Sequence, residues 1–254
     1  MSRETPDPIP PSTAARPEAT VPGDTVPGDK DPGERGPEEY YRSPGRTRLD
    51  GRGYWWAEFL EDVARYRAHH DGSLVKTVLL EQGVWALLQY RISSGVYRST
   101  LPDPVKLPAL LLCVVGHKLA EVVTGFSLPY RANLYPGLYL GHYGPTLINA
   151  DAQVGAGCNI SQGVTIGVSG RGATRGAPVI GDHVYVGAGA VVVGPITVGS
   201  GSVIAANSLV ARDVEPATTV IGVPARRGGT TGSAGMGLHM LPLPVRGTKG
   251  AATR

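Results

Sequence analysis

Branched aliphatic residues recur at every sixth position over much of the second half of the chain, and this spacing constrains the fold more than any other feature. Ten positions in one register are all isoleucine or valine: Ile148, Val154, Ile160, Ile166, Ile180, Val186, Val192, Val198, Ile204 and Val210. A period of six matches neither the 3.6-residue turn of a helix nor the two-residue alternation of a sheet. We therefore interpret the segment as an internal repeat.

Each six-residue unit carries a small or β-branched residue four positions after the aliphatic one, and glycine or alanine often follows the aliphatic residue directly, as in Val154-Gly155. Such a unit is typical of one face of a solenoid, and three units form a coil of 18 residues, as from Ile148 to Ile166. Equivalent residues then stack as aliphatic ladders. The composition agrees, because the chain has 36 glycines for turns and only 6% aromatic residues for a core.

Two intervals break the six-residue step. Leu140 and Ile148 are eight residues apart, which implies a two-residue excursion at His142 and Tyr143. Ile166 and Ile180 are fourteen apart, so residues 168–178 are predicted to project from the solenoid as a loop. Long loops on a rigid scaffold tend to carry function, and the alternative is a tolerated insertion.

Apolar residues with helical spacing come before the repeat. Trp56, Phe59, Leu60 and Val63 follow the i, i+3, i+4, i+7 pattern of one helix face. A second helix, capped by Ser73, is predicted to carry apolar residues from Val75 to Ile92, and a third runs from the prolines at 102 and 104 to Gly125. Residues 53–126 are thus expected to form a small α-helical domain, followed by an all-β solenoid over 127–227.

The two ends of the chain have the composition of tails. Residues 1–52 hold ten of the 22 prolines, and such a segment buries too little apolar surface to offset its ordering entropy. We expect a disordered Pro/Gly-rich tail there, with a docking arm for a partner as the alternative. Residues 228–254 are expected to form a flexible C-terminal tail.

Charge and cysteine content exclude several classes of protein. The formal charge is only +3, without basic residues interleaved with aromatic ones, so no nucleic-acid partner is expected. Cys113 and Cys158 are too few for a disulfide framework. The N-terminal residues lack the apolar stretch after a basic start that is typical of a secretory signal. No apolar run approaches the roughly 18 residues of a membrane-spanning helix. We expect a cytoplasmic protein without a membrane span.

Three motifs carry a resemblance to a known family. Gly141-His142-Tyr143-Gly144, Gln162-Gly163-Val164-Thr165-Ile166-Gly167 and Ile221-Gly222-Val223-Pro224-Ala225-Arg226 resemble the serine acetyltransferase-like branch of the hexapeptide-repeat acyltransferases. The resemblance implies a left-handed parallel β-helix preceded by helices, and assembly as a homotrimer or a dimer of trimers. It also implies acetyl-CoA as the acyl donor and direct transfer to an acceptor hydroxyl.

His142 is the predicted catalytic residue. An alcohol is a poor nucleophile near neutral pH, so its attack on a thioester needs a group that removes the hydroxyl proton. Imidazole has an unperturbed pKa of about 6.5 and suits that exchange. A histidine between glycines is commonly a surface turn residue, but its place in the excursion and the family match favour a general base.

The resemblance also implies contacts with the cofactor. Gly167, Ala188 and Ala206 would line the pantetheine groove between subunits, and Arg171 would meet a CoA phosphate; ordinary turn residues and a solvated arginine are the alternatives. A zinc site needs three converging ligands, and the repeat offers only His142 and His183, so no metal is expected. Cys158 is interpreted as a core residue.

The acceptor is predicted from departures from the family pattern. Four polar or charged functions of serine acetyltransferases fall at Ser127, Gly141, Gly176 and Ala177. Charge-assisted hydrogen bonds contribute roughly 1.5–3 kcal/mol each, so their loss disfavours free serine. We predict a neutral acceptor such as a sugar or glycan precursor. The alternatives are a genuine serine O-acetyltransferase and a non-catalytic hexapeptide scaffold.

Overall fold

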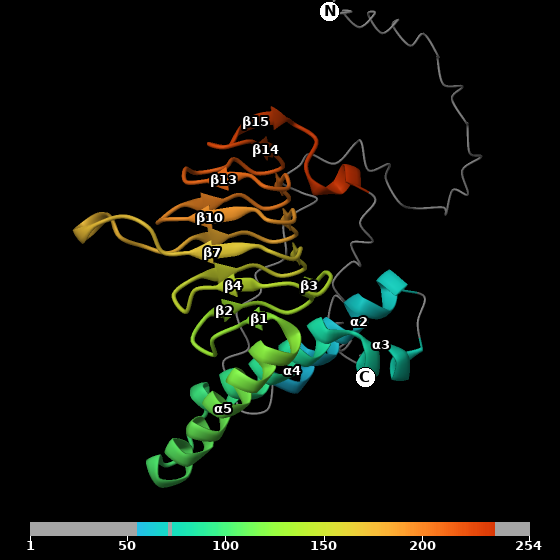
Figure 1. Cartoon of the computed structure of the whole chain (residues 1–254), viewed down its shortest axis with the longest axis vertical. Coiled ribbons are helices and arrows are strands. Elements are labelled where there is room, and N and C mark those ends of the chain that lie inside the picture. Colours follow the sequence, from blue (N-terminus) through green and yellow to red (C-terminus); the bar gives the residue numbers. More distant parts are fainter. Residues whose placement is uncertain (1–54, 71–72, 237–254) are drawn as a thin grey trace, which may run out of the picture. The chain divides into compact units, whose positions relative to one another are not determined.

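The computed structural model describes residues 55–70 and 73–236. The predictions for the 1–52 tail and for residues after 236 lie outside the described residues. Four helices come first, and they are α2 (Trp55–His70), α3 (Leu74–Leu80), α4 (Gln82–Arg98) and α5 (Asp103–Thr124). Short strands follow, and Figure 1 shows them stacked as successive coils.

The strands form the three faces of a β-helix. Sheet A contains β1 (Phe126–Ser127), β4 (Thr146–Ile148), β7 (Thr165–Gly167), β10 (Val191–Val193) and β13 (Leu209–Val210). Sheet B contains β2 (Asn133–Leu134), β5 (Gln153–Val154), β8 (Val179–Ile180) and β11 (Thr197–Val198). Sheet C contains β3 (Tyr139–Leu140), β6 (Asn159–Ile160), β9 (Tyr185–Val186), β12 (Val203–Ile204), β14 (Thr219–Ile221) and β15 (Arg226–Gly229). Every pairing is parallel except that of β14 with β15.

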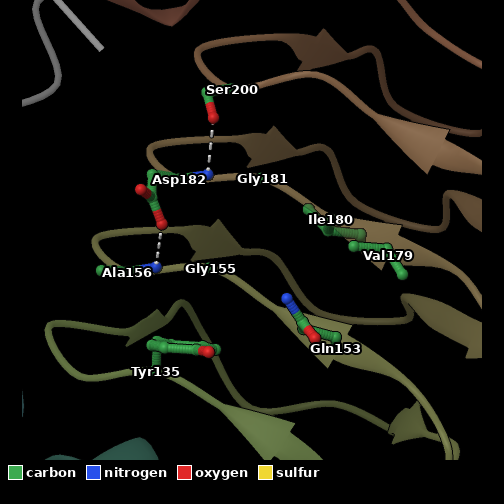
Figure 2. Close-up of a pocket in the computed structure, with 9 residues that line it drawn as sticks. All are labelled: Tyr135, Gln153, Gly155, Ala156, Val179, Ile180, Gly181, Asp182 and Ser200. Atoms are coloured by element: carbon green, nitrogen blue, oxygen red, sulfur yellow. Dashed lines mark hydrogen bonds between the residues drawn. The ribbon is translucent and has the colours of Figure 1, made fainter. Parts of the chain in front are cut away.

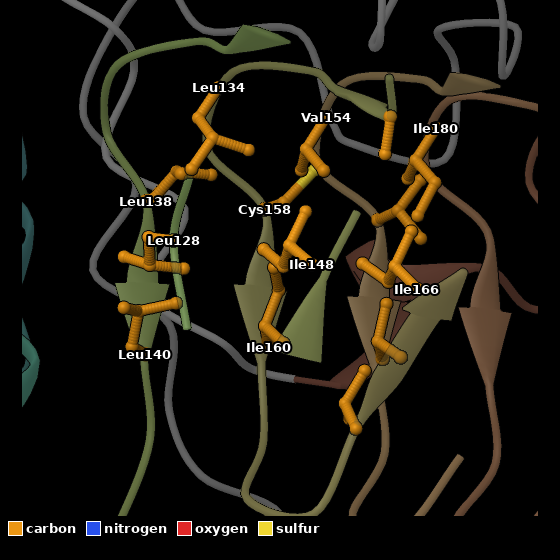
Figure 3. Close-up of a cluster of buried hydrophobic side chains, with 14 of the residues drawn as sticks. Leu128, Leu134, Leu138, Leu140, Ile148, Val154, Cys158, Ile160, Ile166 and Ile180 are labelled. Carbon is orange, nitrogen blue, oxygen red and sulfur yellow. The ribbon is translucent and has the colours of Figure 1, made fainter. Parts of the chain in front are cut away.

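The predicted ladders form the core of the coils. On sheet A, Ile148 pairs with Ile166 and Ile166 with Val192, and all three side chains are buried. Figure 3 shows several of these aliphatic side chains pointing into the space between the sheets. Vertical stacking of branched side chains fills this space without aromatic residues. The solenoid predicted from the six-residue spacing is confirmed.

The helical region differs from the sequence prediction in one place. The single helix expected from Ser73 to beyond Ile92 is two helices, α3 and α4, separated at Glu81, which has an extended backbone. Gly83, in the first turn of α4, lies so close to α2 and the first coil that an added Cβ would stand 2.0 Å from Tyr66 Oη and 2.8 Å from the Leu140 carbonyl oxygen. The start of α4 is thus packed closely against both α2 and the first coil.

Polar side chains of α2 and α4 bond to the backbone of the first coil. Tyr66 Oη accepts a hydrogen bond from the Leu140 N–H at 3.0 Å, and Tyr90 Oη accepts one from the Leu134 N–H at 3.0 Å. The fully buried Arg91 donates to the Leu134 carbonyl oxygen at 2.7 Å and pairs with Asp62 at 2.8 Å. The helices therefore supply partners to strands β2 and β3, which lack a further coil beside them.

Helix α5 packs on α4 but leaves much of its own surface exposed. The exposed apolar residues on it are Val105, Leu107, Leu111, Leu112, Val114, Val115, Leu119, Val122 and Val123. Among the described residues, α5 alone is long and apolar enough to cross a membrane, judged by length and composition only. The sequence analysis expected no such segment. The helix continues through Pro108, Gly116 and Lys118, which interrupt the apolar run but not the helical structure.

The last coil is followed by ordered structure that the sequence analysis missed. Residues 228–254 were expected to be a flexible tail, yet β15 extends to Gly229 and pairs antiparallel with β14. A short 3-10 helix, η2 (Ser233–Met236), follows, and Ser233 Oγ donates to the His183 carbonyl oxygen at 2.7 Å. The first residues of the predicted tail thus pack against the coils.

Candidate active site at the edge of sheet A

His142 lies in the turn that connects β3 to β4, at the edge where sheets C and A meet. Its backbone is left-handed, with φ at 55°, and its side chain is exposed. This conformation is uncommon for a residue other than glycine, and it recurs in the turns of other coils at His183, Asn207 and Ala217. Among the described residues, none forms a hydrogen bond with the imidazole ring. The two-residue excursion predicted from the spacing is therefore a turn that presents an unpaired imidazole to solvent.

The turns above His142 stack along the same edge. Gly144 is so close to the next turn that an added Cβ would stand 2.8 Å from Gln162 Cβ. The Gln162 carbonyl oxygen accepts from the Gly189 N–H at 3.0 Å, and the Ala188 carbonyl oxygen accepts from the Asn207 N–H at 2.8 Å. The structure thus brings three predicted site residues, His142, Ala188 and Ala206, to one edge of the β-helix.

Gly167 and Arg171 lie at the opposite edge of sheet A. The loop over 168–178 follows β7, and paired hydrogen bonds between Ser169 and Gly176, at 3.1 and 3.0 Å, close its base. Its tip is a 3-10 turn, η1 (Gly172–Thr174), directly after the exposed Arg171. Figure 1 shows this yellow segment projecting from the stack. Within one protomer, these two residues are therefore separated from His142 by the width of sheet A.

The outer face of sheet A, between these two edges, is mostly apolar. The strand registers place Leu147, Thr165, Val191 and Leu209 side by side in one outward ladder. Leu147 is 48% exposed. By contrast, α2 covers part of sheet C, where the Tyr66 and Tyr139 rings lie 4.7 Å apart and Arg65 donates to Asn159 at 3.1 Å. Sheet A is thus the face that leaves an apolar ladder uncovered.

A polar cluster lies where α5 enters sheet A. Ser127 Oγ donates to the Glu121 carboxylate, which also contacts His117 at 3.2 Å and Lys118 at 2.6 Å. Burial by itself raises the pKa of Glu121, but the hydrogen bonds from Lys118 and Ser127 and the charge of His117 outweigh it, so the pKa is lowered. Burial lowers the pKa of His117 against the opposing effect of Glu121. This cluster holds an ionised carboxylate beside Ser127. The sequence analysis considered position 127 alone and missed Glu121.

A groove of about 260 Å³ lies at a different edge, between sheets B and C. It is lined by Tyr135, Gln153, Gly155, Ala156, Val179, Ile180, Gly181, Asp182 and Ser200. Figure 2 shows two hydrogen bonds among these residues: Asp182 accepts from the Ala156 N–H at 2.7 Å, and Ser200 Oγ accepts from the Asp182 N–H at 3.0 Å. These contacts join successive turns, so we assign the groove a structural role.

The remaining candidate residues do not join the site. His183 lies in a half-buried turn between sheets B and C, at a different edge from His142. No three His, Cys, Asp or Glu side chains cluster as metal ligands in the part of the chain that the structure describes. Burial raises the pKa of the Cys158 thiol to about 12, in agreement with a core residue.

The chain is similar to hexapeptide transferases and to serine acetyltransferases. Residues 177–212 match the family model "Bacterial transferase hexapeptide (six repeats)". The serine acetyltransferase of Synechococcus elongatus is 36% identical over 60% of this chain and 59% of its own length, and that of Mycobacterium tuberculosis is 30% identical over 64% of this chain and 67% of its own. The chain therefore spans about six tenths to two thirds of these relatives.

Solved structures give the same result. Neisseria gonorrhoeae serine acetyltransferase in complex with serine has a TM-score of 0.59 and 30% identity, and the match covers 69% of each chain. Brucella abortus serine acetyltransferase in complex with coenzyme A has a TM-score of 0.62 and 28% identity, over 70% of this chain and 69% of that one. The predicted left-handed parallel β-helix with preceding helices is confirmed.

The comparisons also correct the predicted acceptor. The sequence analysis predicts a neutral sugar or glycan precursor, and this prediction is wrong, because the relatives are serine acetyltransferases and a neighbour was solved with serine. The departures at four positions therefore do not exclude serine as the acceptor. Glu121 brings a carboxylate to Ser127 from another element, and inspection of position 127 alone cannot detect that charge.

Proposed function

Because the chain belongs to the serine acetyltransferase family of hexapeptide-repeat acyltransferases, we propose that it transfers the acetyl group of acetyl-CoA to the hydroxyl of serine. The observation that carries the proposal is the exposed, left-handed His142 at the same edge as Ala188 and Ala206. This edge offers a base and, on later turns of the same edge, small residues beside which a thioester arm can lie.

The proposed chemistry is a direct transfer. His142 accepts the proton of the serine hydroxyl as the oxygen attacks the acetyl carbonyl carbon, and a backbone N–H stabilises the oxyanion that forms. Collapse of the tetrahedral species breaks the carbon–sulfur bond, and the proton held by His142 passes to the leaving thiolate of CoA. Products are O-acetylserine and CoA, and no covalent intermediate on the protein is required.

The small side chains of the upper turns suit the donor. Ala188 and Ala206 leave room for a pantetheine arm to approach the backbone along the edge above His142. Gly167 and the exposed Arg171 lie at the other edge of sheet A, where a guanidinium can pair with a phosphate. Both edges contribute to one site when two protomers lie side by side.

A homotrimer provides this arrangement. With sheet A turned toward a threefold axis, the outward ladder of Leu147, Val191 and Leu209 becomes buried. The His142 edge of one protomer then meets the 168–178 loop of the next. The exposed face of α5 offers a further surface through which two trimers can pair. Because acetyl-CoA is an intracellular metabolite, we place the reaction in the cytoplasm.

An acceptor panel tests the proposal. Purified protein is mixed with acetyl-CoA and serine, or with neutral sugars, and CoA release is followed with a thiol reagent. We expect turnover of serine and a loss of about 10²–10⁴-fold in kcat for His142→Ala, the usual contribution of a general base. His183→Ala is the matched control and should retain activity.

The outcomes separate the candidate functions. Turnover of serine that survives His142→Ala would eliminate the proposed base. Binding of CoA without acetylation of serine would eliminate serine as the acceptor. A chain that does not bind CoA at all would be a scaffold rather than an enzyme.

A further inference from the structure

Two polar groups near the catalytic edge each lack one hydrogen-bond partner. The His142 ring forms no hydrogen bond with any described residue. The Ser127 hydroxyl donates to Glu121, but none of the residues that the structure describes donates to Ser127 Oγ. A hydroxyl can donate one hydrogen bond and still accept others through its lone pairs. Ser127 therefore has an acceptor site open for an imidazole N–H.

The fold brings these two groups to adjoining coils. Gly125, which ends α5, lies against Gly144, so that an added Cβ would stand 3.1 Å from the Gly144 carbonyl oxygen. The Gly125 carbonyl oxygen accepts from the Thr146 N–H at 3.0 Å, and Ser127 pairs with Leu147 in parallel register. The segment 125–127 thus runs alongside 144–147, and the His142 turn directly precedes the latter. Gly125 lies next to this turn on the coil below, as Gln162 does on the coil above, and Ser127 follows two residues later, opposite Leu147.

We propose that Ser127 and Glu121 form a relay that positions His142 for the serine acetyltransferase reaction. In this relay the His142 Nδ1–H donates to Ser127 Oγ, and the Ser127 O–H donates to the Glu121 carboxylate. The proposal rests on the proposed function for its catalytic consequence, but the relay itself is a property of the chain. Hydrogen bonds to catalytic groups are often open in the absence of substrate and close in the Michaelis complex.

The relay has two consequences for the base. Donation from Nδ1 fixes the tautomer that leaves the Nε2 lone pair free to accept the serine proton. The negative charge of Glu121 stabilises the imidazolium formed during attack, which a neutral serine hydroxyl alone cannot do. Ser127 and Glu121 do not touch the reacting atoms in this scheme, so both are positioning residues.

Other charges near the relay limit its effect. Other titratable groups also lie near the His142 turn. Tyr139 and Tyr143 are on the same segment as His142, and His117 and Lys118 are on α5. Lys118 is paired with Glu121 and opposes its field, while the adjacent turn contributes only the neutral Gln162. We therefore expect an effect of about tenfold, about 1.4 kcal/mol, rather than the larger effect of a carboxylate bonded directly to the imidazole.

Histidine NMR tests the relay without reference to turnover. The full-length protein is labelled with ¹⁵N histidine, and the His142 signals are assigned by their loss in His142→Ala. We expect the Nδ1–H tautomer in wild type and in Ser127→Thr, which keeps the hydroxyl. Glu121→Gln should lower the His142 pKa, because it removes the charge that stabilises the imidazolium, and Ser127→Ala should also change the tautomer. Equal tautomer populations and an equal His142 pKa in wild type, Glu121→Gln and Ser127→Ala would overturn the relay.

Steady-state kinetics on serine provide the second readout. Glu121→Gln should lower kcat about tenfold with little change in the KM for acetyl-CoA, and the acid limb of kcat/KM should move to lower pH. The double variant Ser127→Asp with Glu121→Gln returns a carboxylate to the relay and should recover the lost activity. Glu215→Gln, which changes an exposed glutamate paired with Arg227, is the matched control and should leave kcat unchanged. Failure of the double variant to recover activity would contradict the relay.

The two proposals fail in different ways. If wild type does not acetylate serine, the proposed function fails, yet the NMR measurement still decides whether the relay exists. If wild type acetylates serine and the His142 pKa is unaffected by Glu121→Gln, the relay fails and the proposed function stands.

Discussion

The coils and the helices of this protein are organised by different kinds of contact. In the coils, each aliphatic side chain packs on its equivalent one turn away, so a local spacing of six residues determines the register. In the helices, the decisive contacts are polar and distant in sequence, such as Arg91 with Asp62 and with the Leu134 carbonyl oxygen. The repeated spacing is therefore sufficient to specify the coils. The packing of the helices on the first coil depends instead on a few individual side chains.

The largest effect is expected from Arg91. Arg91→Met should lower the free energy of unfolding by about 3–5 kcal/mol, because it leaves a buried Asp62 without its partner. Urea unfolding followed by circular dichroism measures this loss. Arg227→Met removes an exposed ion pair with Glu215 and should cost about 0–1 kcal/mol. Similar losses in both variants would show that the buried pair does not organise the junction.

An intermediate effect is expected from the glycine at the start of α4. Gly83→Ala should destabilise the protein by about 1–3 kcal/mol, because the new Cβ would overlap Tyr66 Oη and the Leu140 carbonyl oxygen. Gly116→Ala is the matched change within α5, where the nearest atom would lie 3.9 Å away, and it should stabilise the helix by up to about 1 kcal/mol. Thermal denaturation of both variants measures the two shifts in Tm, and equal shifts would rule out a close-packed site at Gly83.

The smallest effect is expected within the coils. Ile166→Val shortens one buried side chain in the ladder between Ile148 and Val192, and it should cost about 0.5–1.5 kcal/mol. The same position holds valine in later coils, so the β-helix already accommodates that side chain. Chemical denaturation provides the measurement. A loss as large as that of Arg91→Met would mean that the coils are no more tolerant than the junction.

Most of the fold follows from local patterns. The spacing of Ile148, Val154 and Ile160 predicts the solenoid, and the eight-residue interval before Ile148 predicts the excursion at His142. The division between α3 and α4 at Glu81 could not be predicted from local patterns. The helical periodicity of that segment continues across the break.

The site could be predicted only in part. His142, Ala188 and Ala206 follow from the repeat and the resemblance, and the structure brings them to one edge. Glu121 could not be identified, since it is carried by α5 and approaches Ser127 only after the helix and the first coil have packed together. The sequence around Ser127 therefore does not indicate that the Glu121 carboxylate lies beside it.

The reversed direction of β15 has a consequence for assembly. A stack of parallel coils has an open strand at each end, onto which a second molecule can add its own coils to make a fibre. At the start of the stack, Tyr66 and Tyr90 already occupy backbone groups of β2 and β3, and at the finish β15 pairs with β14 in the opposite sense. Strands β2, β3 and β14 therefore have partners other than a further parallel coil, which disfavours end-to-end addition of a second β-helix.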